Sequence, residues 1–322
     1  MSLESIKNLV KTDFKEVDKI VTSSLRSHIN LISEVGTYMI KGGGKRLRPL
    51  LVLLCARAIG YKGTQHLALA AVVEFIHTAT LLHDDVIDDS ELRRGRKTAN
   101  YIWSNEASIL VGDFLYSRAF QMMLQVGNLD ILQIFADATN TIAEGEILQL
   151  INKNNPDTSE TNYLDVIRCK TAKLFEAATE FCAILKNCPA AVRATIAQFG
   201  LHLGIAFQLI DDLLDYQKPH NELGKAIGKD LSDGKPTLPI IYLLKYGTSK
   251  EKEMVHEAIS IGNVKNFAAI QYAIARSGAI EYTVNLAKKE GEVAKKAIAE
   301  LAASPYQEAA LALVDFAILR QH

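Results

Sequence analysis

The chain has 322 residues and a formal net charge of −1, with 48% hydrophobic and 23% charged residues. This balance is typical of a globular protein with a sizeable core, and it excludes a chain-wide attraction to nucleic acid or to an anionic membrane. The N-terminal residues mix acids with lysines, and no uninterrupted apolar run approaches the roughly 20 residues of a membrane span, so we expect a cytoplasmic protein.

Apolar residues recur at helical spacing along most of the chain, and the alternation typical of strands is hard to find, so we predict an all-α protein. The helices expected in chain order cover residues 3–27, 47–59, 65–89, 106–126, 129–151, 159–186, 190–216, 237–245, 250–261, 264–277, 280–302 and 305–319. The longest segment without this periodicity is 217–236, and a loop of that length in a compact domain is more often a functional lid than a spacer. No linker divides the chain, so we expect one all-helical domain over residues 1–322.

Two copies of the pattern Asp-Asp-x-x-Asp follow apolar stretches on two of the predicted helices. They are the first acidic motif, Asp84, Asp85 and Asp88, and the second acidic motif, Asp211, Asp212 and Asp215. Residues i and i+4 of a helix lie within about 40° of each other, so each motif crowds like charges on one face. A divalent cation relieves that repulsion, and Mg²⁺ prefers a few carboxylates together with substrate phosphates. Two such motifs facing one another predict Mg²⁺ held against a diphosphate, whereas the alternative for each is a solvated helix end.

Basic residues supply a second kind of group for binding phosphate. Three consecutive glycines precede Lys45 and Arg48 at a predicted helix start, where backbone N–H groups and the helix dipole favour an anion. Arg93 and Arg94 follow the first acidic motif, and His77 lies two helical turns before it on nearly the same face. Guanidinium and ammonium groups suit phosphate, and the histidine can donate to it. The alternatives are a solvated basic turn at the glycines and a core histidine at position 77.

Polar residues also interrupt the apolar faces of two later helices. Lys170 and Thr171 lie within an apolar helix, where a buried lysine requires an anionic partner. Gln208 lies one turn before the second acidic motif, and the loop after that motif carries Lys225 and Lys235, which can close over a bound phosphate. Two acidic motifs and two sets of basic residues together predict two diphosphate groups, one bridged by Mg²⁺ and one held without metal.

Five motifs along the chain resemble those of the trans-isoprenyl diphosphate synthases. In order, they are GGKRLRP, the first DDxxD followed by RRG, the pair KT, FQxxDDxLD and GKxxGxDLxxGKxTLP, and they run from Gly43 to Pro239. The resemblance implies an all-α bundle of long helices around a central elongated cavity, of the isoprenoid synthase type, usually assembled as a homodimer. It also implies Mg²⁺-dependent successive 1'-4 condensation of isopentenyl diphosphate onto an allylic diphosphate. One position departs from the pattern, since Lys229 stands where relatives often have an acid or a small residue.

The resemblance implies a role for each residue that matches a motif. Three Mg²⁺ ions bridging the allylic diphosphate would be held by Asp84, Asp88 and Asp211, with support from Asp85, Asp212 and Asp215. The groups that would contact the same diphosphate are Arg93, Lys170, Lys225 and Lys235. The groups that would bind isopentenyl diphosphate are Lys45, Arg48, His77 and Arg94. The oxygen dipoles that would face the developing allylic cation belong to Thr171 and Gln208.

The implied chemistry needs no side-chain nucleophile, and the sequence shows no obvious Ser-His-Asp triad. Departure of the diphosphate, stabilised by Mg²⁺ and the basic residues, would leave an allylic cation that the isopentenyl double bond attacks. A proton would then pass to the released diphosphate. Water must be excluded throughout, and closure of the loop 217–236 would achieve this.

Small residues upstream of the first acidic motif indicate a long product. The hydrocarbon tail would run along the helix 65–89, about 37 Å long at about 1.5 Å per residue, where Ala79 and Thr80 present no bulky ring. Met123 and Phe135 on neighbouring helices are candidates for the floor of the tunnel, with core packing as the alternative. Within the family, the resemblance favours bacterial enzymes that extend farnesyl diphosphate to an octaprenyl product for the side chain of ubiquinone or menaquinone. Hepta-, nona- and decaprenyl products are the alternatives.

Two other functions share part of this pattern. A class I terpene cyclase also binds Mg²⁺ through DDxxD in an all-α fold, but its second metal motif typically contains Asn, Ser and Glu, and it needs no second diphosphate site. A non-catalytic subunit of a heteromeric synthase would be expected to lose acids, whereas this chain keeps all six. We therefore predict a long-chain synthase whose partners are its two diphosphate substrates, with no nucleic acid, loose membrane association for product release and a second copy in a homodimer.

Overall fold

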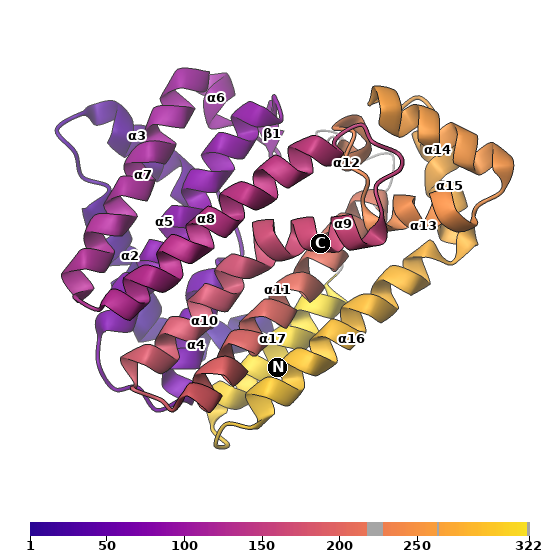
Figure 1. Ribbon diagram of the computed structural model, residues 1–322. Coiled ribbons are helices and arrows are strands. Elements are labelled where there is room, and N and C mark those ends of the chain that lie inside the picture. The colour runs from indigo at the N-terminus through magenta and orange to yellow at the C-terminus, as the bar shows by residue number, and fades with distance from the viewer. Residues whose placement is uncertain (218–227, 263, 321–322) are drawn as a thin grey trace. The chain divides into compact units, whose positions relative to one another are not determined.

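Helices make up nearly all of the regular structure of this protein (Figure 1). The computed structural model describes residues 1–217, 228–262 and 264–320. The helices in chain order are α1 (Leu3–Leu9), α2 (Lys11–Ser24), α3 (Asn30–Lys41), α4 (Leu47–Ala58), α5 (Gln65–Ile87), α6 (Ala99–Ile102), α7 (Asn105–Val126), α8 (Leu129–Asn152), α9 (Glu160–Ile167), the π-helical turn η1 (Arg168–Ala172), α10 (Lys173–Leu185), α11 (Ala190–Gln217), α12 (Lys229–Ser232), α13 (Leu238–Tyr246), α14 (Ser249–Ile261), α15 (Phe267–Ser277), α16 (Ala279–Ala299) and α17 (Pro305–Leu319). The strands β1 (Leu92–Arg93) and β2 (Arg96–Lys97) form an antiparallel hairpin. The prediction of an all-α fold is confirmed.

The structure differs from the predicted helices in several places. The segment 3–27 is broken at Val10, which separates α1 from α2, and the short helix α12 lies inside the segment predicted to be a loop. Helix α3 was not predicted, although its sequence is amphipathic, and it buries only Val35 and Gly36. A Cβ atom at Gly36 would lie 2.7 Å from Cδ2 of Leu25, so α3 packs closely against the end of that side chain.

The hairpin turns the chain back immediately after the first acidic motif. Arg94 has a φ of 53° and Gly95 a φ of 74°, and two consecutive residues with positive φ are what a two-residue hairpin turn requires. Lys97 at the end of the hairpin accepts a hydrogen bond at its carbonyl oxygen from the Tyr38 hydroxyl, at 2.7 Å. The hairpin therefore directs the neighbouring side chains of Arg93 and Arg94 to different partners, which are described below.

The chain divides into two compact units. The first unit comprises Met1–Thr139, Leu174–Ala197 and Ile298–Leu313. Its central helix is α5, against which α2, α4 and α7 pack (Figure 1). Leu50, Leu53 and the other residues of α4 between 50 and 56 have no exposed surface, so α4 is an interior helix as well. The acidic motif at the end of α5 is thus held by a helix that is itself fixed by the core.

The second unit is built from three other stretches. They are Asn140–Lys173, Gln198–Ala297 and Val314–His322. One of its apolar clusters joins α13, α14 and α15 (Figure 1), and another joins α9, α13 and the second half of α11. Leu209 and Ile210, which directly precede the second acidic motif, belong to the latter cluster and are buried. The second acidic motif therefore also follows buried turns of a helix.

A π-helical turn interrupts the segment that was predicted as one helix over 159–186. The turn packs closely against α8 within the second unit, where a Cβ atom at Gly145 would lie 2.7 Å from the backbone nitrogen of Lys170 and 2.8 Å from Cβ of Cys169. Apolar periodicity does not reveal such a turn, because the helix continues on both sides of it. The widened turn contains Lys170 and Thr171, two of the predicted site residues, and π turns are often found at functional sites.

Two helices, α5 and α11, are long and apolar enough to cross a membrane by length and composition alone. In their most apolar windows, 72% of the residues of α5 and 44% of those of α11 are buried inside the protein. A buried core helix meets the same criterion, so these two helices are weak evidence for a membrane span.

Candidate active site

The first acidic motif lies at the C-terminal end of α5, in the first unit. Asp85 is 1% exposed, whereas Asp84 and Asp88 are half-buried. The Asp88 N–H ends the helix by donating to the carbonyl oxygen of Asp84. Arg93, which was predicted to contact a diphosphate, donates from Nε to both carboxylate oxygens of Asp85, at 2.9 and 3.2 Å. The buried carboxylate is therefore neutralised by a guanidinium eight positions further along the chain.

The predicted basic site at the glycine-rich turn also lies in the first unit. Gly43 and Gly44 have φ values of 83° and 143°, and the guanidinium of Arg94 donates to the carbonyl oxygen of Gly43. A Cβ atom at Gly44 would lie 2.4 Å from that guanidinium, so the glycine is what allows the close approach. The half-buried Lys45 follows directly. The structure thus brings Arg94 to the turn that carries Lys45, as the sequence predicted for one common phosphate site.

His77 and Arg48 contact each other in the same unit. Nη1 of Arg48 lies 3.1 Å from Nε2 of His77, and its guanidinium stacks over the ring of Phe175 at 4.6 Å. Burial, and then the positive charge of Arg48, hold the pKa of His77 well below its usual range. The imidazole is therefore neutral and, because arginine can only donate, its Nε2 accepts and its N–H is on Nδ1.

Glu74 is a buried acid that the sequence analysis did not select. It is 8% exposed on α5, and Arg46 lies 3.7 Å away, with the charges of Arg48 and Arg94 also acting on it. Burial raises the pKa of Glu74, and these three arginines act in the opposite direction. The sequence signal that could have identified Glu74 is its position as an acid within the apolar run LALAAVVEFI. Its charge offsets the repulsion among the guanidinium groups of the basic site.

The second acidic motif lies at the C-terminal end of α11, in the second unit. Asp211 is exposed, and Arg320 donates to its Oδ1 at 2.8 Å while stacking over Phe207. Asp212 is buried and accepts hydrogen bonds from the Tyr163 hydroxyl and from Nε2 of Gln208, both at 2.6 Å. Burial raises the pKa of Asp212 to about 7, although these two hydrogen bonds act in the opposite direction.

The third aspartate of this motif, Asp215, is also buried and contacts the segment that follows α11. The N–H of Asp230 donates to Oδ2 of Asp215 at 3.0 Å. Burial, and then the charge of Asp215, raise the pKa of Asp230 well above its usual range. Lys235, predicted to bind a diphosphate, lies 3.1 Å from Asp233. Lys225, predicted for the same role, lies outside the described residues.

The π turn presents its two polar residues to different helices of the second unit. Nζ of Lys170 donates to Glu146 on α8 at 2.6 Å, so the anionic partner that the sequence required for this lysine is present. The Thr171 hydroxyl donates to Oε1 of Gln208 on α11 at 2.8 Å. Thr171 and Gln208, predicted to act together, are thus in direct contact.

The residues predicted to set the product length all lie in the first unit. Ala79 and Phe135 have no exposed surface, and Met123 is 1% exposed. Thr80 is half-buried, and its hydroxyl donates to the carbonyl oxygen of His77 at 2.9 Å. Phe135 packs against the ring of Phe181 with a centroid distance of 5.5 Å. These contacts are those of core residues, and the roles in chain length stay predictions.

Among the described residues, no three His, Cys, Asp or Glu side chains come together as a ligand set for a metal. The predicted ligands are nevertheless carboxylates near the surface, with Asp84 and Asp88 half-buried and the Asp211 side chain 54% exposed. Mg²⁺ takes one or two carboxylates from a protein and completes its shell with water and substrate phosphate. The donor chemistry of both motifs therefore fits Mg²⁺ that arrives with a diphosphate.

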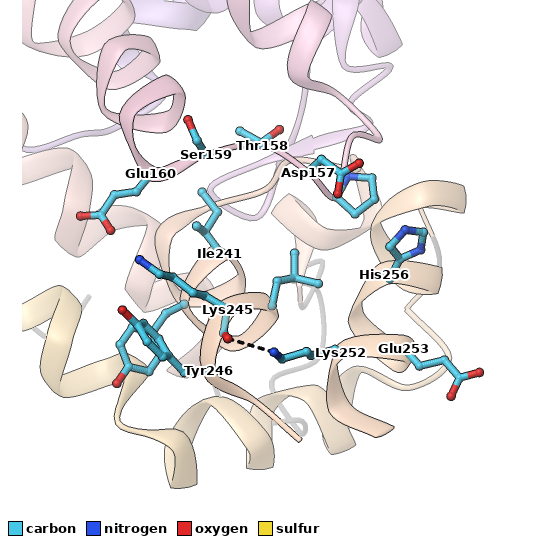
Figure 2. Close-up of a pocket in the computed structure, with 13 residues that line it drawn as sticks. Asp157, Thr158, Ser159, Glu160, Ile241, Lys245, Tyr246, Lys252, Glu253 and His256 are labelled. Atoms are coloured by element: carbon cyan, nitrogen blue, oxygen red, sulfur yellow. Dashed lines mark hydrogen bonds between the residues drawn. The ribbon is translucent and has the colours of Figure 1, made fainter. Parts of the chain in front are cut away.

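A cavity of about 590 Å³ lies in the second unit (Figure 2). It is lined by the loop before α9 together with residues of α13 and α14, among them Tyr242, Tyr246 and His256. Lys252 donates across it to the carbonyl oxygen of Lys245 at 2.9 Å (Figure 2). None of the side chains predicted for catalysis or substrate binding lines this cavity.

Comparisons with known proteins cover nearly the whole chain. The family profile described as "Polyprenyl synthetase" matches residues 29–276. The chain is 46% identical over 321 residues to octaprenyl diphosphate synthase of Escherichia coli (strain K12), covering 99% of each chain. It is 41% identical over 312 residues to an all-trans-nonaprenyl-diphosphate synthase (geranyl-diphosphate specific) of Rhodobacter capsulatus, covering 97% of this chain and 96% of that one. The fold is similar to that of a polyprenyl synthase from Caulobacter crescentus CB15 complexed with calcium and isoprenyl diphosphate, with a TM-score of 0.95 and 40% identity over 100% of this chain and 98% of that chain.

Proposed function

This chain belongs to the polyprenyl synthetase family, and from that premise we propose that it is a prenyltransferase that extends farnesyl diphosphate to octaprenyl diphosphate with Mg²⁺. Each cycle joins isopentenyl diphosphate to the allylic diphosphate in a 1'-4 condensation. The observation that carries the proposal is that both copies of the acidic motif follow buried helical turns, and in each the middle aspartate is buried with hydrogen-bonding partners. A solvated helix end, which was the alternative for each motif, has no reason to bury one of its acids.

The allylic diphosphate would be held through Mg²⁺ by Asp84, Asp88 and Asp211. When bound, the metal would stabilise negative charge on the departing diphosphate. Three ions would be held in this way, the number that the family resemblance implies. Lys170 and Lys235 would add direct ion pairs to the same group, and their acidic neighbours Glu146 and Asp233 orient the two side chains.

Isopentenyl diphosphate would bind at the basic site of the first unit without metal. Lys45, Arg48 and Arg94 supply the charge, and the positive φ values of Gly43 and Gly44 let the backbone approach an anion closely. The neutral imidazole of His77 would contribute a hydrogen-bond donor at Nδ1, since its Nε2 faces Arg48. A substrate held in this way keeps its double bond free to attack.

The cationic stage of the reaction would be stabilised by oxygen dipoles. The hydroxyl hydrogen of Thr171 points to Gln208, so the lone pairs of Thr171 are directed elsewhere and can face positive charge. No side-chain base is required, because the released diphosphate can accept the proton that leaves the condensation product. Exclusion of water protects the cation, and the segment 217–236 is the predicted source of that closure.

The test is incubation of the purified protein with farnesyl diphosphate, radiolabelled isopentenyl diphosphate and Mg²⁺, followed by separation of products by chain length. A product of eight isoprene units supports the proposal. A product of seven, nine or ten units would correct only the chain length. Absence of elongation would contradict the synthase, and a cyclic hydrocarbon would indicate a terpene cyclase instead. Asp84→Asn and Asp211→Asn are each expected to lower the rate at least about 100-fold, since each removes charge from the metal-binding set.

Product length provides a second test of the same proposal. Ala79 lies about one helical turn before Asp84, on a helix along which the hydrocarbon tail would run. Ala79→Tyr is expected to shorten the product, because the ring would obstruct the tail near the reacting end. An unchanged product on thin-layer chromatography would place the tail elsewhere.

The proposal includes a homodimer in the cytoplasm, loosely associated with membranes when it releases product for a quinone side chain. Exposed apolar residues support a partner surface on α7 and the start of α8 in the first unit, where they include Leu110, Leu124 and Leu129. Patches of this kind usually mark protein or membrane contacts. Light scattering of the wild type and of Leu110→Glu measures the oligomeric state, and a monomeric wild type would contradict the dimer.

A further inference from the structure

Tyr163 begins a path of hydrogen bonds that runs through the second acidic motif to Thr171. Its hydroxyl donates to Oδ2 of Asp212 at 2.6 Å, and Nε2 of Gln208 donates to Oδ1 of the same carboxylate at 2.6 Å. The Thr171 hydroxyl donates to Oε1 of Gln208 at 2.8 Å. Both oxygens of the carboxylate and both polar atoms of the amide therefore have a partner on this path.

The path has a direction, because the two carboxyl oxygens of Asp212 are the acceptors for the Tyr163 hydroxyl and for the amide nitrogen of Gln208. The amide of Gln208 must turn its NH₂ group toward Asp212, since the reversed amide would bring two oxygens together. Its carbonyl oxygen then faces Thr171 and accepts the hydroxyl hydrogen. The oxygen lone pairs that remain on Thr171 point away from Gln208, which is the arrangement that stabilises a developing cation.

The path is largely buried, with Gln208 its one half-buried member, and it joins two elements of the second unit. Tyr163 is 4% exposed, Asp212 is 7% exposed and Thr171 is 8% exposed. Tyr163 and Thr171 belong to α9 and the π turn that follows it, whereas Gln208 and Asp212 lie one turn apart on α11. Hydrogen bonds in such surroundings are stronger than in water, and a buried carboxylate that loses a donor is destabilised and free to rotate.

We propose that Tyr163 is a positioning residue for prenyl transfer: its hydroxyl holds Asp212, which orients Gln208 and so directs the Thr171 oxygen toward the forming cation. The inference rests on the proposed function, since it assigns Thr171 to the cationic stage of that reaction. Tyr163 reaches the reacting atoms through three other side chains. It therefore governs the rate of bond formation, and the binding of the two diphosphates does not depend on it.

The experiment compares the wild type with Tyr163→Phe, which keeps the buried ring and removes the hydroxyl. Single-turnover rapid quench of the first condensation is the measurement, because it is independent of the release of a long product. The rate constant is expected to fall about tenfold, in line with the loss of one hydrogen bond to a charged group. The half-saturating concentrations of both diphosphates are expected to stay within about twofold of the wild type.

Tyr282→Phe is the matched control. The Tyr282 hydroxyl also donates to a carboxylate in the second unit, that of Glu160, at 2.8 and 3.0 Å from its two oxygens. The hydroxyl takes no part in the path to Thr171, so its removal is expected to leave the rate constant unchanged. An equal loss in both variants would show a general effect on folding and would overturn the assignment of Tyr163.

A double-mutant cycle distinguishes positioning from a purely structural role. If Tyr163 acts through Thr171, then Tyr163→Phe introduced into Thr171→Val is expected to change the rate constant less than about twofold. If the losses of rate in Tyr163→Phe and Thr171→Val multiply in the double variant, the proposal is overturned. Should Tyr163→Phe unfold at the assay temperature, Gln208→Leu interrupts the same path with Tyr163 in place. The rate constant of Gln208→Leu is then expected to match that of Thr171→Val, and the variant that carries both changes is expected to match either single variant. If the two losses multiply instead, the path is overturned.

The proposed function and this inference fail in different ways. A folded wild type that does not extend farnesyl diphosphate overturns both. An active wild type with a Tyr163→Phe variant that keeps its full rate constant, or that loses affinity for a diphosphate instead, overturns the positioning role alone.

Discussion

The first and second acidic motifs have the same sequence pattern but stabilise their buried aspartates in different ways. Asp85 is held by the guanidinium of Arg93, a cation only eight positions away on the hairpin that follows α5. Asp212 is held by two neutral donors, and one of them, Tyr163, is 49 positions away in the chain. Burial accordingly raises the pKa of Asp212 to about 7.

The difference shows that a repeated motif need not be electrostatically equivalent in its two places. In the first motif a positive charge compensates the buried carboxylate directly. In the second, both hydrogen-bond donors that hold the buried Asp212 are neutral, and under the proposed function the bound metal would supply positive charge to the motif. The exposed Asp211, paired with Arg320 at 2.8 Å, is the member of that motif most accessible to a ligand.

Arg93→Met gives the largest effect expected from this comparison. It removes the guanidinium from a carboxylate that is 1% exposed, and breaking a buried pair typically costs a few kcal/mol. Because the Arg93 side chain is itself 33% exposed, we expect the free energy of unfolding to fall by about 2–3 kcal/mol. Urea unfolding measures it, with Arg276→Met at an exposed ion pair as the control. Equal losses in the two variants would refute the special role of burial at Asp85.

Gly145→Ala tests the tertiary packing on which the second motif depends. The added Cβ atom would lie 2.7 Å from the backbone nitrogen of Lys170. A backbone atom cannot move away without shifting the rest of its helix. Strain outweighs the gain in helix propensity, so we expect a loss of about 1–2 kcal/mol in the free energy of unfolding, together with lower activity. Gly291→Ala is the control, because the nearest atom there is the end of the Ile318 side chain, at 2.2 Å. A stabilised Gly145→Ala protein would contradict the packing argument.

Asp212→Asn is expected to change the free energy of unfolding by no more than about 1 kcal/mol. Asparagine loses one acceptor for the donors Tyr163 and Gln208, but it also removes a carboxylate whose charged form burial disfavours. The two effects oppose each other, in contrast to Arg93→Met. Urea midpoints of metal-free protein would measure the change. A loss as large as that of Arg93→Met would mean that both motifs are compensated alike.

Glu251→Gln gives the smallest expected effect, because the ion pair that Glu251 forms with Arg276 lies near the surface. The Thr248 N–H, and then Arg276, lower the pKa of Glu251 to about 2 from its usual 4.5. A carboxyl group whose pKa is lower in the folded protein stabilises the fold at pH values above its unfolded pKa. This contribution is lost as the pH falls from about 4.5 toward about 2. We expect the free energy of unfolding of the wild type to exceed that of the variant by at most about 0.5 kcal/mol at neutral pH and to converge with it near pH 2. Unfolding curves at the two pH values test this, and a difference that grows in acid would reverse the sign.

Much of the fold and part of the site were predictable from local pattern. Apolar periodicity placed α5 and α11 and put an acidic motif at the end of each, and the buried position of Lys170 required the acid that Glu146 supplies. The pattern missed α3, whose buried face is small, and the π turn, which leaves periodicity intact on both sides. It also missed Tyr163 and Asp230, because nothing local distinguishes a tyrosine or an aspartate that will face a remote carboxylate.

The sequence by itself determined the residue types and their spacing: six aspartates on two apolar helices, a glycine-rich basic turn, and small residues upstream of Asp84. The spacing follows from the geometry of one helix, so it needs no knowledge of other segments. Only the tertiary structure decided which aspartates of each motif are buried and what holds them. Those partners come from the hairpin at Arg93, from Tyr163 and from Arg320, which is 109 positions from Asp211. Burial and hydrogen bonding depend on packing between segments distant in the chain, and that packing gives two identical motifs different electrostatics.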